Sequence, residues 1–144
     1  KGYPGRTLVC LTVIMPGKVK RNLKSLVVAQ AAVTALGSAF GSEMLKLELR
    51  DLPTGYEAYL VTPLSNEEAK RETCRIENTH PLGRLFDLDV IDSDGIPVSR
   101  ESIGLSPRKC LVCDNEARFC MRNRTHTMAE LSTKIDEMIE AYVR

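Results

Sequence analysis

The run LFDLDVI at 85–91 constrains the fold of this chain more than any other stretch. Apolar and charged residues alternate in it, and residues two apart on a β-strand point to the same face of a sheet. The face predicted to be buried in a core is formed by Phe86, Leu88 and Val90. Asp87 and Asp89 fall on the other face, about 7 Å apart, where two like charges repel each other. Because aspartate is also depleted in strands, this pair calls for a compensating partner.

A bound divalent cation would offset the repulsion, because hard cations such as Mg2+ prefer carboxylate oxygens. Such a cation would hold phosphate oxygens during phosphoryl or nucleotidyl transfer. The pattern alone leaves an equal alternative, in which both acids lie at a solvent-facing strand end and are simply hydrated. The DSDG stretch at 92–95 resembles part of a calcium loop, but the first ligand position would fall on Val90, which cannot bind a metal. We therefore expect a turn at 92–95.

The surrounding pattern predicts an α+β domain. Strand patterns cover 7–15, 44–50, 56–62 and 83–92. Helix patterns cover 22–40, beginning at a candidate N-cap Asn22, and 65–80, where Ser65 and Glu68 fit a capping box. The order strand, helix, strand, strand, helix, strand is that of a ferredoxin-like split βαβ fold, a two-layer sandwich with helices on one face of an antiparallel sheet. The opposite sheet face would then be available for a site.

The last third of the sequence has a different character. We expect one domain over 1–144, divided into an α+β core at 1–103 and a Cys/Arg-rich loop with a C-terminal helix at 104–144. A short strand is expected at 96–99, and the loop is expected to be irregular as far as residue 126. The final helix would begin at Thr127, with Glu130 completing a second capping box.

Four potential metal ligands gather in this loop: Cys110, Cys113, Cys120 and His126. Their spacing fits a Cys3His zinc site, which would organise a segment that has little core of its own. The alternative is that the cysteines are buried small hydrophobic residues or an incidental thiol cluster. Cys10 and Cys74 fall in a predicted strand and a predicted helix, where we expect them to be inert.

Basic residues form two runs that would suit a polyphosphate. Lys18, Lys20 and Lys24 follow the first strand and its Pro-Gly turn. The second run follows the acids and contains Arg100, Arg108, Lys109, Arg118, Arg122 and Arg124. Arginine makes bidentate contacts to phosphate, although an ordinary solvated surface is the better explanation for any single residue.

The composition argues against two classes of partner. The chain has 20 Lys and Arg against 19 Asp and Glu, a net charge of +1, and only 5% aromatic residues, so we expect no nucleic acid. We find no run of about 18 apolar residues and expect no membrane span. The odd number of cysteines (5) and the lack of a visible secretory signal favour a reducing, cytoplasmic setting.

Several blocks of the sequence are similar to those of a known enzyme family. They are TVIMPGKVK at 12–20, HPLGRLFDLDVID at 80–92, PVSR at 97–100, GLSPRKCLVCD at 104–114 and CMRNRTH at 120–126. Together they resemble the holo-citrate lyase synthase family, also called apo-citrate lyase phosphoribosyl-dephospho-CoA transferase, over nearly the whole chain.

The resemblance implies a nucleotidyltransferase-type enzyme. It would take 2′-(5″-triphosphoribosyl)-3′-dephospho-CoA and transfer the phosphoribosyl-dephospho-CoA group to a serine of the citrate lyase acyl carrier (gamma) subunit, releasing pyrophosphate. Asp87 and Asp89 would then hold Mg2+ against the triphosphate, and His80 is the nearby candidate for a general base. Candidate phosphate contacts are Arg84, Arg100, Arg108, Lys18 and Lys20. The competing class is a non-catalytic, zinc-stabilised adaptor module that binds the carrier protein.

Overall fold

Four strands and four α-helices make up the described part of the protein, and they differ little from the predicted elements. The computed structural model describes residues 6–14, 22–92 and 94–143. The strands are β1 (Thr7–Val13), β2 (Lys46–Leu52), β3 (Gly55–Thr62) and β4 (Phe86–Ile91). The helices are α1 (Leu23–Phe40), α2 (Asn66–Thr79), α3 (Ala117–Asn123) and α4 (Met128–Val143). Short 3-10 turns are η1 (Gly41–Glu43), η2 (Gly83–Leu85) and η3 (Glu101–Ile103).

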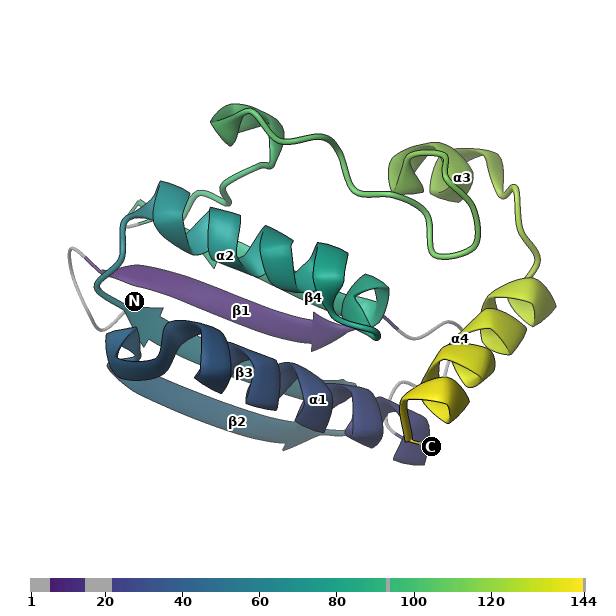
Figure 1. Ribbon diagram of the computed structural model, residues 1–144, viewed down its shortest axis with the longest axis horizontal. Helices are drawn as coiled ribbons and strands as arrows, with labels where there is room; N and C mark the ends of the chain where they lie inside the picture. The colour runs from purple at the N-terminus through teal and green to yellow at the C-terminus, as the bar shows by residue number, and fades with distance from the viewer. Residues whose placement is uncertain (1–5, 15–21, 93, 144) are drawn as a thin grey trace.

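The four strands form one antiparallel sheet in the order β2-β3-β1-β4. Helix α1 connects β1 to β2, and β3 lies between these two strands. Helix α2 likewise connects β3 to β4, and β1 lies between them, so β1 and β3 are central and β4 is an edge strand (Figure 1).

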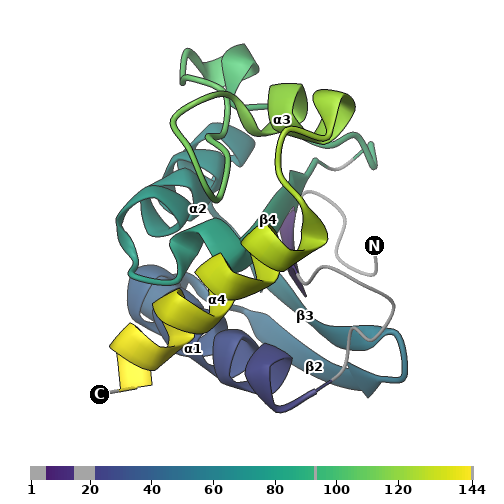
Figure 2. The same ribbon diagram turned by 90° about the vertical axis from the view of Figure 1, so that its right-hand side faces the viewer.

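Helices α1 and α2 pack on the same face of the sheet and form the second layer (Figure 2). The core lies between the layers. Its largest fully buried side chains are Phe40, Phe86, Leu11, Leu36, Leu60, Leu82, Leu85, Leu88 and Ile135. The predicted two-layer α+β architecture is confirmed.

The predicted helix starts are formed by side-chain caps. The Asn22 side chain accepts a hydrogen bond from the Ser25 N–H at 2.9 Å, which begins α1. Ser65 and Glu68 cap each other's backbone N–H groups at 3.1 Å, and Thr127 and Glu130 do the same at 2.8 and 3.0 Å. Each reciprocal pair satisfies two N–H groups that a helix end would otherwise leave without a partner.

Three predicted segments need correction. The strand expected at 83–92 begins with the 3-10 turn η2, and only Phe86–Ile91 pairs with β1. Residues 96–99 form no strand, only the isolated bridge between Ile91 and Pro97, because a proline has no N–H for a sheet ladder. The expected irregular segment 104–126 contains α3, a helix of 7 residues that is too short to show a periodic pattern.

Helix α4 closes one end of the sandwich. Its Ile135 is 1% exposed in the core, and Asp136 forms an ion pair with Lys24 at the start of α1. Among the described residues, one helical stretch, Leu23–Glu43, is long and apolar enough by composition to cross a membrane, contrary to our expectation of none. In this structure that stretch contains α1, whose buried face packs on the sheet.

Candidate functional site

Asp87 and Asp89 lie on the face of the sheet that is turned away from α1 and α2, which we call the distal face. The alternating residues of β4 point the other way and are at most 1% exposed: Phe86, Leu88 and Val90. In the antiparallel register, Asp87 is opposite Thr12 and Asp89 is opposite Cys10 on β1. The predicted alternation of this strand is therefore confirmed, and the two carboxylates share one face.

The surroundings of Asp89 disfavour its negative charge. The Asp89 side chain is exposed at one side, but burial of the rest and the neighbouring Asp87 charge raise its pKa above the usual range. Burial also raises the pKa of the Cys10 thiol, and the nearby carboxylates of Asp89 and Glu57 add to this shift. A bound divalent cation would lower the pKa of Asp89, because it favours the ionised carboxylate.

The distal face carries a third carboxylate beside the first two. Glu57 of β3 is opposite Thr12 on β1, whose other neighbour is Asp87. A cavity of about 340 Å³ is lined by Thr12, Glu57 and Asp87 together with residues 54–56, where β3 begins. The Tyr59 hydroxyl donates a 2.5 Å hydrogen bond to Glu57, which raises the pKa of Tyr59. The alternation in the YEAYLVT strand gave a signal for this pair, because Glu57 and Tyr59 are two residues apart.

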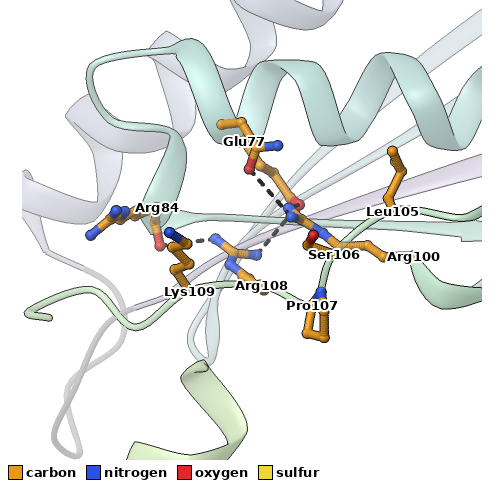
Figure 3. A pocket seen from close by; sticks show the side chains of 9 residues that line it. Glu77, Arg84, Arg100, Leu105, Ser106, Pro107, Arg108 and Lys109 are labelled. Carbon is orange, nitrogen blue, oxygen red and sulfur yellow. Dashed lines mark hydrogen bonds and ion pairs between the residues drawn. The ribbon is translucent and has the colours of Figure 1, made fainter. Parts of the chain in front are cut away.

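On the other side of β4, the carboxylate of Glu77 on α2 is buried among hydrogen-bond donors. It accepts from Arg100 at 2.5 Å and from Arg108 at 3.0 Å (Figure 3). It also accepts from the Leu88 backbone N–H at 2.9 Å. Only 4% of its side chain is exposed. Glu77 therefore ties α2 and the loop after β4 to the outer edge of β4.

The two arginines belong to a pocket of about 390 Å³ that we call the cationic pocket. It is lined by Glu77, Asn78, Arg84, Arg100, Leu105, Ser106, Pro107, Arg108 and Lys109 (Figure 3). Arg108 also donates to the carbonyl oxygens of Gly83, Arg84 and Phe86 at 2.5 to 3.2 Å. The structure thus brings together three of the predicted phosphate contacts, Arg84, Arg100 and Arg108, but not on the distal face where the acids lie.

The remaining predicted site residues are His80, Lys18 and Lys20. Lys18 and Lys20 lie outside the described residues. His80 ends α2, and its Nδ1 accepts a hydrogen bond from the Leu82 N–H at 3.0 Å. Its ring lies 4.9 Å from that of Phe86, on the helix-covered side of the sheet, and burial lowers its pKa. His80 and the pair of acids therefore lie on opposite sides of β4.

The four predicted zinc ligands do converge. One ligand atom each from Cys110, Cys113, Cys120 and His126 lies within 4.8 Å of all the others. The Cys113 and Cys120 sulfurs are 3.5 Å apart, and His126 Nε2 is 3.4 Å from the Cys113 sulfur. In a tetrahedral site with Zn–S bonds of about 2.3 Å, ligand atoms are about 3.8 Å apart. The spacing of the four ligand atoms therefore suits an ion of the size of Zn2+.

The thiols of Cys110 and Cys120 have pKa values shifted in opposite directions. Burial opposes ionisation of Cys110, but hydrogen bonds from the backbone N–H groups of Val112 and Cys113 and from the thiols of Cys120 and Cys113 together lower its pKa. Burial and the neighbouring thiols raise the pKa of Cys120 to about 11. A metal ion would remove these thiol protons, because thiolate is the form that binds metal. The cluster also contacts the cationic pocket, since Arg84 donates to the Cys110 carbonyl oxygen at 2.9 Å.

Comparison with known proteins places the chain in a family. The family model described as apo-citrate lyase phosphoribosyl-dephospho-CoA transferase matches residues 1–142. A protein of Streptococcus pyogenes serotype M18, named as a probable enzyme of this description, is 36% identical over 146 residues, covering 99% of this chain and 76% of the relative. One of Vibrio cholerae serotype O1 with the same name is 42% identical over 139 residues, covering 94% of this chain and 78% of the relative. The chain therefore belongs to the apo-citrate lyase phosphoribosyl-dephospho-CoA transferase family.

Proposed function

We propose that this protein is a transferase that attaches the phosphoribosyl-dephospho-CoA group to apo-citrate lyase, as the names of its relatives state. The observation that carries this proposal beyond the family name is the pair Asp87 and Asp89. Both carboxylates lie on the distal face, and Asp87 lines a cavity there. Such a pair suits a cation that carries a polyphosphate.

The proposed donor is 2′-(5″-triphosphoribosyl)-3′-dephospho-CoA, and the proposed acceptor is a serine of the acyl carrier (gamma) subunit. The serine oxygen forms a bond to the phosphorus next to the ribose. The bond from that phosphorus to the bridging oxygen breaks, and pyrophosphate leaves with the bond electrons. When bound, Mg2+ would neutralise phosphate charge during this exchange. Asp87 and Asp89 would hold and orient it, because both carboxylates lie on the same face.

The serine proton needs an acceptor in this reaction. His80 was the candidate from the sequence, but its ring packs on Phe86 on the side of β4 that faces away from the acids. Glu57 is the carboxylate that shares a cavity with Asp87, so the geometry favours Glu57 over His80 for this role. The Tyr59 hydroxyl would orient the Glu57 carboxylate through their 2.5 Å hydrogen bond.

We also propose that Cys110, Cys113, Cys120 and His126 hold Zn2+ as a structural site. All four ligands come from the protein, which leaves no open position for a catalytic water. The ion would join the loop before α3 to the turn after it. The thiols must stay reduced to bind zinc, which supports a cytoplasmic location.

The proposal is tested by the intact mass of the carrier subunit after incubation with this protein, the donor and Mg2+. We expect a mass gain that matches the prosthetic group. Asp87→Asn and Asp89→Asn should each lower the initial rate at least about 100-fold, as expected when the charge that holds a catalytic cation is removed. Asp94→Asn, a matched change in the exposed turn after β4, should leave the rate unchanged.

Two outcomes would contradict the proposal. Full transfer by folded Asp87→Asn protein would remove the metal role of the acids. Binding of the carrier subunit without any mass gain, equal in the wild type and in both variants, would favour a non-catalytic adaptor instead.

A further inference from the structure

We propose that the cationic pocket binds the diphosphate of the donor's dephospho-CoA portion, as a second anion subsite distinct from the acids of the distal face. This inference deepens the proposed function and rests on it for the identity of the donor. It is carried by the charge of the pocket, by the contacts already made within it, and by its position at the edge of β4.

The pocket carries more positive charge than its own acid can neutralise. Four cations line it, namely Arg84, Arg100, Arg108 and Lys109, against the one carboxylate of Glu77, which leaves a formal charge of +3. Arg100 and Arg108 are 10% and 22% exposed in their side chains, so water solvates them poorly. Uncompensated charge in such a place is costly, and an anion from solution would relieve it.

The Glu77 carboxylate pairs with Arg100 and Arg108, and the described contacts join it to neither of the other two cations. One of its oxygens accepts from Arg100, and the other accepts from Arg108 and the Leu88 N–H. Arg84 uses one guanidinium nitrogen, Nη1, for the Cys110 carbonyl oxygen. Lys109 is exposed, and the described residues give its ammonium group no hydrogen-bond or ion-pair partner. Arg84 and Lys109 are therefore the groups with donors to spare.

Polar groups at the rim complete a site for phosphate oxygens. Ser106 and Asn78 line the same pocket, and the Asn78 oxygen accepts from Arg100, which leaves the amide nitrogen as a donor. A volume of about 390 Å³ accommodates a diphosphate and part of an attached group. A diphosphate has oxygens enough to contact both a guanidinium and an ammonium group.

The position of the pocket relates it to the acids. Leu88, whose N–H contacts Glu77 at 2.9 Å, lies between Asp87 and Asp89 in the chain. Glu77, in the wall of the pocket, therefore contacts β4 at the same position along the strand as the two acids. It lies at the edge of the strand, on the side of the helices, whereas the acids lie on the distal face. One extended molecule can place one anionic group on the distal face and another in the pocket by crossing the edge of β4.

The proposed donor has two such groups. Its triphosphate undergoes the chemistry, and a diphosphate links its adenosine to its pantetheine arm, with a ribose and the adenosine between the two. The triphosphate belongs with the acids, because it needs a cation to approach carboxylates. The diphosphate needs no metal in a pocket that is already cationic.

The test is calorimetric titration of the zinc-loaded protein with dephospho-CoA in buffer without added Mg2+. We expect binding to the wild type, and affinity lowered about tenfold in Lys109→Gln and in Arg84→Gln, since each removes one charged hydrogen bond. Arg75→Gln removes an exposed arginine of α2 outside the pocket and should bind like the wild type. Pantetheine, which lacks the diphosphate, should not bind.

Because Arg84 also contacts the metal cluster, Lys109→Gln is the decisive variant, and zinc content and melting temperature are measured for both. Wild-type affinity in Lys109→Gln and in correctly folded Arg84→Gln would overturn the inference. Failure of the wild type to bind dephospho-CoA would also overturn it. So would variants that still bind dephospho-CoA like the wild type but no longer bind tripolyphosphate in the presence of Mg2+.

This titration separates the inference from the proposed function, because it needs neither the carrier subunit nor any turnover. Dephospho-CoA binding that depends on Lys109, in a protein that transfers nothing, would support the subsite and contradict the transferase. Transfer with an unchanged KM for the donor in Lys109→Gln would support the transferase and contradict the subsite.

Discussion

The guanidinium of Arg84 donates a 2.9 Å hydrogen bond to the carbonyl oxygen of Cys110, so a wall of the cationic pocket is attached to the first ligand of the Cys3His cluster. Arg108 and Lys109 precede that ligand directly in the chain. Arg108 is itself held by Glu77 and by carbonyl oxygens around η2. The metal cluster and the pocket therefore share one short segment of backbone, and a change in one is expected to reach the other.

The first prediction concerns metal loss. Cys113→Ser should lower the zinc content from one equivalent to well below one and lower the melting temperature. If free zinc is about 1,000 times the dissociation constant, binding stabilises the folded protein by about 4 kcal/mol, and the variant forfeits most of this. Elemental analysis and thermal unfolding check both effects. Cys74→Ser, a change at a cysteine of α2 outside the cluster, should keep the zinc, and an equal zinc content in the two variants would contradict the site.

The second prediction concerns the buried carboxylate. Glu77→Gln leaves the guanidinium groups of Arg100 and Arg108 partly buried without a counter-charge, which should cost about 3–5 kcal/mol of unfolding free energy. Glu72→Gln breaks an exposed pair with Arg75 on the same helix and should cost less than about 1 kcal/mol. Urea unfolding of the zinc-loaded proteins measures both. A similar cost for the two changes would show that Glu77 is not the electrostatic centre of the pocket.

The fold could be predicted from the sequence wherever the signals were local. The caps at Asn22, Ser65 and Thr127 mark helix starts with side chains close in the sequence, and the alternation in β4 fixes which residues are buried. Helix α3 could not be predicted in this way. It has no side-chain N-cap and spans 7 residues, so its formation depends on contacts with the Cys3His loop that a local pattern does not contain.

The site could be predicted only in part for the same reason. Asp87 and Asp89 are neighbours on one strand, so their shared face follows from the sequence. Glu77 was missed because its partners come from 23 and 31 residues later in the chain. Its position one turn after Thr73 on the buried face of α2 was the available signal. An acid on such a face needs a cation, but periodicity does not say which one.

The third prediction separates stability from function at Asp89. Its raised pKa means that the folded state binds the proton more tightly than the unfolded chain, so stability falls as pH rises through the folded pKa. Asp89→Asn removes this charge and should stabilise the zinc-loaded protein without Mg2+ by up to about 1 kcal/mol at pH 7. The gain should disappear in acid, below the unfolded pKa near 3.8. Urea unfolding at several pH values checks this. A variant that is less stable than the wild type at pH 7 would contradict the electrostatic argument.

The fourth prediction uses the lowered pKa of His80. Burial makes His80 bind a proton less readily in the folded state than in the unfolded chain. Neutral His80 therefore contributes stability above the unfolded pKa of 6.5, and this contribution is lost as pH falls below that value. His80→Asn keeps an oxygen that can accept from the Leu82 N–H but does not titrate. The difference in melting temperature between about pH 5 and pH 7.5 should be smaller in this variant than in the wild type, with zinc bound in both. An unchanged difference would show that folding does not shift the pKa of His80.

The last prediction tests how closely η2 packs on the end of α2. A Cβ at Gly83 would lie 2.2 Å from the Glu77 carbonyl oxygen, which is backbone and cannot move aside as a flexible side chain could. Gly83→Ala should therefore cost about 3 kcal/mol or more and disturb the carbonyl oxygens that Arg108 contacts. Gly37→Ala is the matched control, because nothing lies within 4 Å of its added Cβ inside α1, and alanine favours a helix by about 0.5–1 kcal/mol. The same substitution should thus shift the urea midpoint in opposite directions at the two glycines. A shift of the same sign at both would mean that η2 has room to move away from α2, and that the geometry around Arg108 is less constrained than its contacts indicate.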